Sequence, residues 1–535
     1  MRCCFTLLLT AFEALPLFGV QYPYFCSVEA NPAVNVLIAL ELFSLAAVFA
    51  LPEIWTGMRA LFKGTGNPAA ISAYAVLLSF VCTLVTAFSG GTSCLTPAAL
   101  IVTAATISAG RRIKRDVLSF RVASGKRMKY VLDRYEIEQG GREEAKLSEY
   151  LPENPTMLKI NKADFIEDFT ENASKRTANA KMTSAFLAAS ALLFVAALAI
   201  GLIIQKNGGL AVATAYKICI TSLPLSAFAA LTVPSFVAAK RAKRIDSAEI
   251  GEGNAEACSE ASVVSFDDTE VYPPYAIKLK KIKLYENSRI DHVLFSMTSL
   301  FGKTGGPLYD VLKAAASDIG QTDDVRINLA TENGIDALVG TEHVLVGNKL
   351  YMEQEQFIPV YTKDDELAES NNEYRIMYFA AGGKIRGKFY LRYTMDADFV
   401  DIIKTLSSSG RCVAVRTMDP NIDVTLLSAD IDVSSYPVTV LHCDVPEDKV
   451  QKKQSSSSPV ISVSSPKELL TALTYSDKMC KGFKTGLLIS FLCFAIGIIL
   501  SLAAAFADMQ GSIAPLFIAA YQAAFAIAVH ITSRL

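Results

Sequence analysis

Eight apolar stretches, separated by short polar loops or by longer charged segments, constrain this chain more than any other feature of its sequence. A helix needs about 20 mostly apolar residues to cross a lipid bilayer. Each stretch reaches or approaches that length, and spanning segments must be helical because lipid offers their backbone no hydrogen bonds. The predicted spans are Cys3–Val20, Val34–Leu51, Ile71–Ser89, Cys94–Ala109 (the shortest), Ala185–Ile204, Leu210–Ala230, Leu487–Ala507 and Ile513–Ile531.

The composition agrees with a membrane protein that also has large water-exposed parts. Apolar residues make up 51% of the chain and charged residues 19%, which is too charged for a wholly intramembrane protein. The net charge of −2 gives no basis for binding nucleic acid, so the lipid bilayer is the first predicted partner. The first stretch lacks the basic start and the small-residue cleavage site of a signal peptide, and it is interpreted as a span.

Lysine and arginine residues predict the orientation of the spans, because they concentrate on the cytosolic side. They follow the second span at Arg59 and Lys63, the fourth from Arg111, and the sixth from Lys240 to Arg244, whereas the opposite loops hold almost none. Both termini and both large loops are therefore predicted to be cytosolic. The predicted location is integral to a membrane, the cell or plasma membrane.

The two large loops differ in their predicted structure. Residues 110–183 are expected to be helical extensions of the fourth and fifth spans around a short irregular middle, which is too small for a sheet domain of its own. Residues 240–486 alternate strand-like and helix-like runs, which predicts an α/β fold. Gln451–Ser465 is expected as a serine-rich loop. Outside that loop, the expected strands are Asp336–Val346, Arg375–Ala381, Lys388–Tyr393, Cys412–Thr417 and Val438–His442, and Ala397–Ser408 is expected as an amphipathic helix.

One short apolar run places a candidate reactive residue at a strand end. Ser262–Phe266 is β-branched and apolar, so it is predicted as a buried strand, and Asp267, Asp268 and Thr269 follow it directly. Open α/β sheets carry their chemistry at the carboxyl ends of their strands. A carboxylate in that place can act as a nucleophile, which makes Asp267 the candidate reactive group.

The order of spans and loops, together with several short motifs, resembles that of the heavy-metal (CPx-type) P-type ATPases over nearly the whole chain. Each motif is weak alone, and their order and spacing carry the resemblance. In chain order they are Leu223-Pro224-Leu225 for the intramembrane Cys-Pro-Cys, Phe266-Asp267-Asp268-Thr269 for DKTGT, Gly334 and Gly347 for the nucleotide domain, Thr417-Met418-Asp419 for TGD, and Val445 to Lys449 for PEDK.

The resemblance implies an α-helical membrane domain of about eight spans and a cytosolic α/β haloacid-dehalogenase-like phosphorylation domain with an α+β nucleotide-binding-domain-like insertion. Asp267 would be the phosphoacceptor, a position that the departures below make vestigial. ATP and Mg²⁺ are the implied cofactors. The residues implied around them are Thr269, Thr417, Asp419 and Lys449 at the phosphoacceptor, and Gly334 and Gly347 at the nucleotide.

The same resemblance divides the chain into seven parts. Residues 1–110 hold spans 1–4, and residues 111–183 form a short cytosolic helical loop in place of the family's actuator domain. Residues 184–238 hold spans 5–6. Residues 239–275 and 401–482 are the two parts of the phosphorylation-like domain, residues 276–400 are the nucleotide-binding-like domain, and residues 483–535 hold spans 7–8.

Departures from the family pattern at the phosphorylation motif count against catalysis. Asp268 stands where the family has a lysine, and Glu270 adds negative charge beside Asp267, which repels an approaching triphosphate. The GDGxND run that comes after PEDK in the family is replaced here by the serine-rich segment. Serines do not replace the carboxylate oxygens that Mg²⁺ requires, so the motifs for ATP and Mg²⁺ are degraded and no cofactor is predicted.

Two further departures lie outside that motif. Residues 110–183 contain no TGE motif, which in the family belongs to the domain that positions the hydrolytic water. Leu223 and Leu225 stand where the family has two metal-binding cysteines. Soft thiolates select copper and zinc, so no metal site is predicted.

Two acidic residues lie inside predicted spans. An ionisable group in a span costs roughly 3 kcal/mol on insertion scales and marks a candidate interaction site. Glu13 and Glu41 both lie in the first pair of spans. They predict either a hydrogen bond to a neighbouring helix or contact with a membrane protein partner.

Three hypotheses follow. The first is a membrane pseudoenzyme on a P-type ATPase scaffold, without ATP-driven transport and with a structural or regulatory role. The second is a divergent ATP-driven cation transporter. The third is a nucleotide-binding sensor that does not hydrolyse its ligand.

Overall fold

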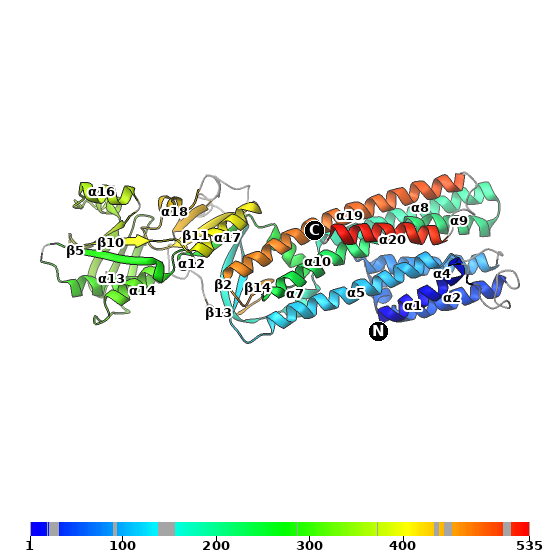
Figure 1. Cartoon of the computed structure of the whole chain (residues 1–535), viewed down its shortest axis with the longest axis horizontal. Coiled ribbons are helices and arrows are strands. Elements are labelled where there is room, and N and C mark those ends of the chain that lie inside the picture. The colour runs from blue at the N-terminus through cyan, green and yellow to red at the C-terminus, as the bar shows by residue number, and fades with distance from the viewer. Residues whose placement is uncertain are drawn as a thin grey trace.

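The chain forms an elongated molecule in which three parts lie in a row (Figure 1). The computed structural model describes residues 2–18, 20, 32–88, 94–136, 156–285, 287–371, 373–432, 438–442, 452–506 and 515–533. Long helices form one end, an eight-stranded sheet lies in the middle, and a six-stranded sheet forms the other end. The predicted fold class, a helical membrane domain with an α/β cytosolic part and an α+β insertion, is confirmed.

The helical part contains the apolar segments of the chain. The start of its first helix and the end of its last helix both lie at the end that faces the sheets (Figure 1). Its helices are α1 (Arg2–Ala14) with the 3₁₀ turn η1 (Leu15–Phe18), α2 (Pro32–Phe49), α3 (Leu51–Lys63), α4 (Ala69–Phe88), α5 (Thr96–Ala123), α8 (Met182–Gln205), α9 (Gly208–Ser222), α10 (Ser226–Arg244), α19 (Pro466–Phe506) and α20 (Pro515–Thr532).

Among the described residues, fewer helices meet the length and apolarity of a membrane span than the eight predicted. Within the described ranges, five helical segments are long and apolar enough to cross a membrane, or six if α2 and α3, which meet at 83°, count as one. The predicted spans at α1 and α5 fall short. The 13 residues of α1 extend only about 20 Å, and α5 runs on into the basic sequence from Arg111. The number of apolar residues in a stretch does not indicate at which residue its helix ends.

The eight-stranded sheet joins segments from both cytosolic loops. Its order is β12-β11-β4-β2-β1-β14-β3, and β13 pairs with β2 off this path. The half from β12 to β2 is parallel, whereas β1, β14 and β3 pair antiparallel. The strands are β1 (Lys129–Glu136), β2 (Thr156–Ile166), β3 (Ser247–Glu249), β4 (Val263–Asp267), β11 (Cys412–Thr417), β12 (Val438–His442), β13 (Lys452–Ser456) and β14 (Val460–Ser462).

Two sequence predictions are wrong here. The predicted helical loop over residues 111–183 contains β1 and β2, and the predicted serine-rich loop over residues 451–465 contains β13 and β14. In both cases a partner strand distant in sequence supplies the backbone hydrogen bonds, so pairing overrides weak local propensity. The serines hydrogen-bond as well, since Ser456 Oγ donates to Asp133 Oδ1 at 3.0 Å and Ser458 Oγ to the Leu132 carbonyl at 2.5 Å.

We call β1, β2, β3 and β14 the junction. Each helix that leaves the membrane part toward the sheet is followed or preceded by one of these strands: α5 leads into β1, β2 leads back to α8, α10 leads into β3, and β14 leads into α19. The connection from β2 to α8 passes through α7 (Phe169–Ser174) and η3 (Ala178–Lys181). All four helices are therefore attached to one continuous sheet.

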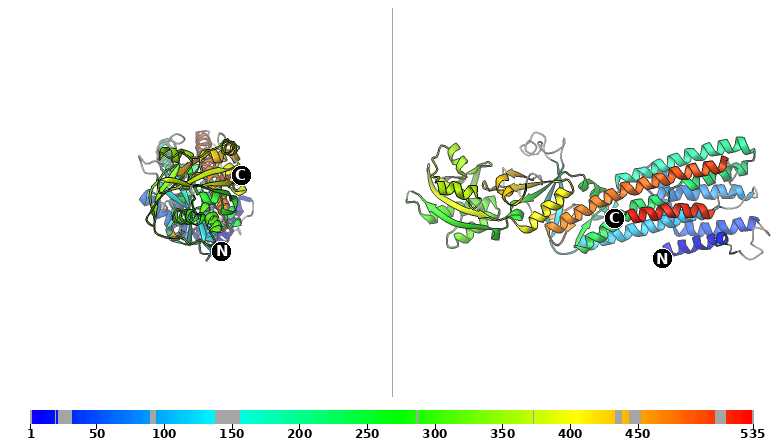
Figure 2. Two further views of the ribbon diagram at one scale, coloured as in Figure 1. Left: turned by 90° about the vertical axis from the view of Figure 1, so that its left-hand side faces the viewer. Right: turned by 45° about the horizontal axis from the view of Figure 1, so that its top comes forward.

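Apolar side chains pack on one face of the sheet beneath helices. Phe266 and Val415 lie in a core with Phe399 and Leu473, from α17 (Ala397–Ser408) and α19. Phe266 and Phe399 meet edge to face with ring centroids 5.1 Å apart. The 41 residues of α19 run from this core into the membrane part (Figure 2). The remaining short helices of this part are α11 (Glu252–Ser259), α12 (Asp268–Val271) and α18 (Val424–Asp430).

The six-stranded sheet is antiparallel, in the order β5-β10-β9-β8-β7-β6. The single strand predicted at Asp336–Val346 is a hairpin of two strands, because Gly340 adopts φ +59° at the turn. On one face, Lys388 and Asp365 form a buried ion pair of 2.6 Å. The elements are η4 (Pro274–Ala276), β5 (Ile277–Leu284), α13 (Ile290–Thr304), α14 (Pro307–Ala315), β6 (Val325–Ala330), β7 (Gly334–Val339), β8 (Glu342–Gly347), α15 (Lys349–Gln354), α16 (Lys363–Ser370), β9 (Arg375–Ala381) and β10 (Lys384–Tyr393).

Candidate functional site

Asp267 lies at the carboxyl end of β4, a strand whose five residues are all buried. Its side chain caps the short helix α12, because Oδ1 accepts a hydrogen bond of 3.0 Å from the backbone N–H of Asp268. The Thr269 hydroxyl donates to Oδ2 at 3.3 Å. An aspartate is favoured at a helix N-cap for this geometry, so the carboxylate orientation is fixed by local hydrogen bonds.

The neighbouring parallel strand β11 brings Thr417 and Asp419 to the same edge. Thr417 Oγ1 donates to Asp268 Oδ2 at 2.8 Å and accepts from the Asp419 backbone N–H at 2.9 Å. Four of the five residues predicted around the phosphoacceptor, including Asp267 itself, therefore lie together. The fifth, Lys449, lies outside the described residues.

Tyr393 is part of this group, although no feature of the sequence singles it out. Its hydroxyl donates to Asp419 Oδ2 at 2.6 Å, while the backbone N–H of Asn421 donates to Asp419 Oδ1 at 3.0 Å. Burial raises the pKa of Tyr393 well above its ordinary value, and the nearby Asp419 carboxylate raises it further. Tyr393 therefore stays neutral and holds Asp419 in place from the end of β10.

The cations near Asp267 come from strands on either side of β4. Arg416 is the register partner of Asp267 in β11, and its buried guanidinium lies over the ring of Tyr135, 5.7 Å from the centroid. Lys159 in β2 is the register partner of Ser265. A search for charged residues next to the motif in sequence misses both, because only the sheet brings these strands together.

Glu270 adds a further acidic group beside Asp267. Burial raises the pKa of the Glu270 carboxyl to about 7, although the ammonium of Lys162 in β2 favours the charged form. Burial therefore favours the neutral form of this carboxyl. The site is rich in acids whose charge is offset by protein cations.

The described residues at this site do not fit a magnesium ion. Among the described residues, no three Asp, Glu, His or Cys side chains are grouped so that they could hold a metal. The carboxylates of Asp267, Asp268 and Asp419 accept hydrogen bonds from protein donors. Mg²⁺ requires oxygen ligands in near-octahedral geometry, and the strand beside β4 instead supplies Lys159 and Lys162.

The two glycines predicted to contact a nucleotide have a packing role. Gly334 and Gly347 are register partners in the β7–β8 hairpin. A Cβ at Gly334 would lie 2.1 Å from the ring of Tyr351, and one at Gly347 would lie 2.6 Å from it. The buried ring of Tyr351 therefore occupies the space that the glycines leave, and these residues do not fit a nucleotide on that face.

Leu223, Pro224 and Leu225 form the break between α9 and α10. A proline break leaves backbone carbonyls without intrahelical donors, and here the buried amide of Gln522 in α20 supplies them. Its Nε2 donates to the carbonyls of Ile220 at 2.7 Å and Leu223 at 2.9 Å. The side chains of both leucines are buried, and the amide of Gln522 supplies the hydrogen bonds that the carbonyls at the helix break would otherwise lack. Gln522 could have been singled out from the sequence as an amide side chain inside a span.

Fold and site together define an integral membrane protein whose cytosolic α/β domain places an aspartate at the carboxyl edge of its parallel strands. No protein-family model and no curated protein sequence matches the chain. Structural neighbours that span nearly its whole length are PIB-type P-type ATPases.

Three of these similarities have the following extent. One crystal structure of a zinc-transporting PIB-type ATPase is 13% identical, with 98% of this chain and 99% of that chain covered and a TM-score of 0.49. A crystal structure of a zinc-transporting PIB-type ATPase in a second state is 12% identical, with coverages of 100% and 98% and a TM-score of 0.48. The N-domain of a copper-transporting P-type ATPase is 14% identical over 22% of this chain and 99% of its own, with a TM-score of 0.17.

Proposed function

We propose that this protein is a P-type-ATPase-like membrane scaffold with a structural or regulatory role, which does not carry out ATP-driven transport. The observation that carries the proposal is the junction. Because α5, α8, α10 and α19 all lead into or out of one continuous strand ladder, that ladder restrains movement of these four helices relative to one another.

Buried polar contacts reinforce the junction. Arg115 of α5 forms an ion pair with Glu252 of α11, and both side chains are buried. The hydroxyl of Ser119 donates to the carbonyl of Glu249 in β3 at 2.7 Å. Glu256 accepts a hydrogen bond of 2.7 Å from Thr177 just before α8. Breaking such buried pairs is costly, so these contacts favour one fixed arrangement.

The chemistry of the candidate site supports the same proposal. Strand β2 is longer than β4, and β13 pairs with the part of β2 that lies beyond the end of β4. Strand β13 therefore lies in line with β4, on the far side of Asp267. Phosphoryl transfer relies on positioning and on cations that offset the charge of the phosphates. Here Asp268 and Glu270 add acids, and Arg416 is buried among protein contacts.

A phosphorylation assay tests this proposal. Purified full-length protein is incubated with γ-labelled ATP and Mg²⁺, beside Asp267→Asn and the control Asp310→Asn, which changes an exposed carboxylate on α14. We expect no acid-stable label in any of the three. Label in the wild type and in Asp310→Asn that disappears in Asp267→Asn would overturn the proposal in favour of an active transporter. ATP-dependent thermal stabilisation without label would favour a nucleotide sensor.

A partner in the membrane is the second part of the proposal. Leu37, Glu41, Leu45 and Val48 form one exposed stripe along α2. A carboxyl on a lipid-facing stripe is costly, and a partner helix with a hydrogen-bond donor would remove that cost. Glu13, by contrast, is buried in its own helical bundle, where Thr96 hydrogen-bonds its side chain. Glu41 is therefore the proposed contact.

Photo-crosslinking in intact membranes tests the partner. A photoreactive residue at Leu45 should give a discrete adduct that disappears when Glu41→Leu is added. The same residue at Val81, exposed on α4, is the control and should give no such adduct. An adduct that persists in Glu41→Leu would exclude the carboxyl as the contact.

A further inference from the structure

An apolar groove and a basic cavity adjoin each other at the cytosolic end of the membrane helices. The groove, about 520 Å³, lies between α1, α5, α10 and α20, and its walls include Ile107, Phe228, Ala229, Ala526 and Ile527. The basic cavity, about 360 Å³, opens beside α10. The two share Arg111 and His530 in their linings, so they lie directly beside each other.

The second cavity concentrates positive charge. Five of its eight lining residues are basic: Arg111, Lys240, Arg241, Arg244 and His530. We call these five residues the cationic mouth. Among the residues that the structure describes, no aspartate or glutamate lines either cavity. A negatively charged group in the mouth would therefore meet several cations and no opposing acid from these linings.

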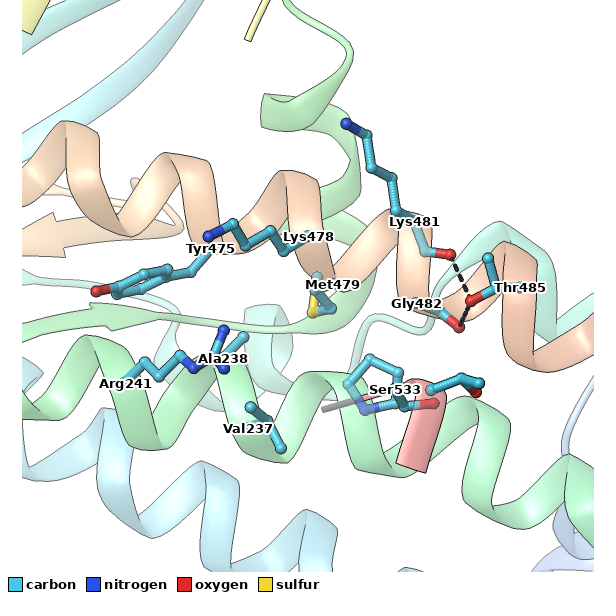
Figure 3. A pocket seen from close by; sticks show the side chains of 12 residues that line it. Val237, Ala238, Arg241, Tyr475, Lys478, Met479, Lys481, Gly482, Thr485 and Ser533 are labelled. Atoms are coloured by element: carbon cyan, nitrogen blue, oxygen red, sulfur yellow. Dashed lines mark hydrogen bonds between the residues drawn. The ribbon is translucent and has the colours of Figure 1, made fainter. Parts of the chain in front are cut away.

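A third cavity, of about 200 Å³, continues this charge around α10. It lies between α10 and α19 and shares Arg241 with the cationic mouth. Arg241 of α10 and Lys478 of α19 both line this cavity, whereas the Lys481 side chain points away from α10 (Figure 3). The basic surface thus covers two sides of α10, and the apolar groove opens on only one of them.

The position along the helices matches the boundary of a membrane. On α5 the apolar part ends just before Arg111, on α10 it ends just before Lys240, and α20 reaches His530 in its last turn. Basic residues at such helix ends are typical of the cytosolic interface. The groove therefore lies at the depth of lipid chains, and the mouth at the depth of lipid headgroups.

We propose that this composite site binds one anionic glycerophospholipid, with an acyl chain in the groove and the phosphate in the cationic mouth. Basic pockets between membrane helices on the cytosolic side bind anionic headgroups. The groove selects a lipid over free phosphate because it offers apolar surface that only an acyl chain covers. The site lies between α1, α5, α10 and α20, whereas Asp267 caps α12, which Figure 1 shows beside the sheets. The inference therefore goes beyond the proposed function and does not depend on it.

Native mass spectrometry of the full-length protein in detergent tests the site, with phosphatidylglycerol or phosphatidylcholine added in turn. We expect one phosphatidylglycerol to be retained more tightly than phosphatidylcholine. The double variant Lys240→Gln/Arg244→Gln should weaken it by about tenfold to thirtyfold, because each basic residue contributes about 1 kcal/mol. Lys243→Gln is the matched control, since Lys243 lies on the same helix, pairs with Asp246 and does not line the site.

A second pair of variants tests the acyl chain. Ala526→Trp should fill the groove and reduce retention of phosphatidylglycerol, whereas Ala524→Trp, exposed on the same helix, should not. Equal retention of both lipids, or equal effects of each variant and its control, would overturn the proposal. Displacement by inorganic phosphate together with an unchanged Ala526→Trp would assign the mouth to free phosphate instead. Arg111→Gln provides a single charge variant if the double variant unfolds.

Discussion

Removing Asp477 should release the start of β11 from α19. The Arg411 side chain is 3% exposed and that of Asp477 15%. Arg411 donates to Asp477 through Nη1 at 2.5 Å and Nη2 at 2.6 Å. It also donates through Nε to the Ala261 carbonyl at 3.1 Å and through Nη2 to the Ser259 carbonyl at 2.9 Å. One guanidinium therefore joins β11, the segment before β4, and α19.

The cost of Asp477→Ala follows from this geometry. Removing one partner of a buried pair costs about 3–5 kcal/mol, because the other charge stays buried without compensation. Asp477 is partly exposed, so water can reach the vacated space, and we expect a loss near the lower end. For a unit of about 150–250 residues, that loss lowers the Tm of the cytosolic part by roughly 6–12 °C.

Thermal unfolding of the full-length protein in detergent measures this effect. Asp291→Ala is the control, because Asp291 pairs with Arg289 on the surface, where the side chains are 59% and 82% exposed. The control should change the Tm little, since exposed pairs contribute little to stability. Replacing both partners, Arg411→Met/Asp477→Leu, should recover most of the loss. A Tm change in Asp477→Ala no larger than that in Asp291→Ala would refute the reasoning.

Three further outcomes are expected. Burial raises the pKa of the Glu249 carboxyl from 4.5 to about 8. Between these two pH values the folded protein binds a proton that the unfolded chain does not, so the free energy of unfolding should fall as pH rises from about 4.5 to about 8. Glu249→Gln should abolish that fall when unfolding is measured as a function of pH. Gly334→Ala should lower the Tm by overpacking against Tyr351, a cost of about 1–3 kcal/mol, and adding Tyr351→Leu should restore part of it; no loss would contradict the packing role. The double variant Lys159→Cys/Ser265→Cys should form a disulfide on oxidation, because paired neighbouring strands lie about 5 Å apart. A peptide map without that link would contradict the pairing of β2 with β4.

The sequence predicted correctly those features that depend on short segments. The predicted strands Arg375–Ala381, Cys412–Thr417 and Val438–His442 have the bounds of β9, β11 and β12. Asp267, Thr417 and Asp419 lie together, as the shared edge of parallel strands requires. Local β-branched and apolar runs are enough to place such strands and the residues directly after them.

The partners of those strands depend on contacts between distant segments. No local pattern indicates that β2, from the first cytosolic loop, lies beside β4, or that a serine-rich run supplies β13 and β14. Nor does any pattern indicate that Tyr351 fills the space at Gly334. Pairing between strands satisfies the backbone N–H and C=O groups whatever the side chains are. Polar strands therefore show little alternation of apolar and polar residues, and a search for hydrophobic periodicity misses them.

The sequence by itself therefore determined the class of this protein: apolar segments long enough for membrane helices, an α/β cytosolic part, and an acidic strand end at Asp267. Only the tertiary structure decided that the four helices leaving the membrane converge on the junction, and that the cations of α5, α10 and α20 line one cavity, the cationic mouth. The physical reason is that apolar patterning fixes where a segment is buried, whereas long-range pairing and packing fix which segments meet.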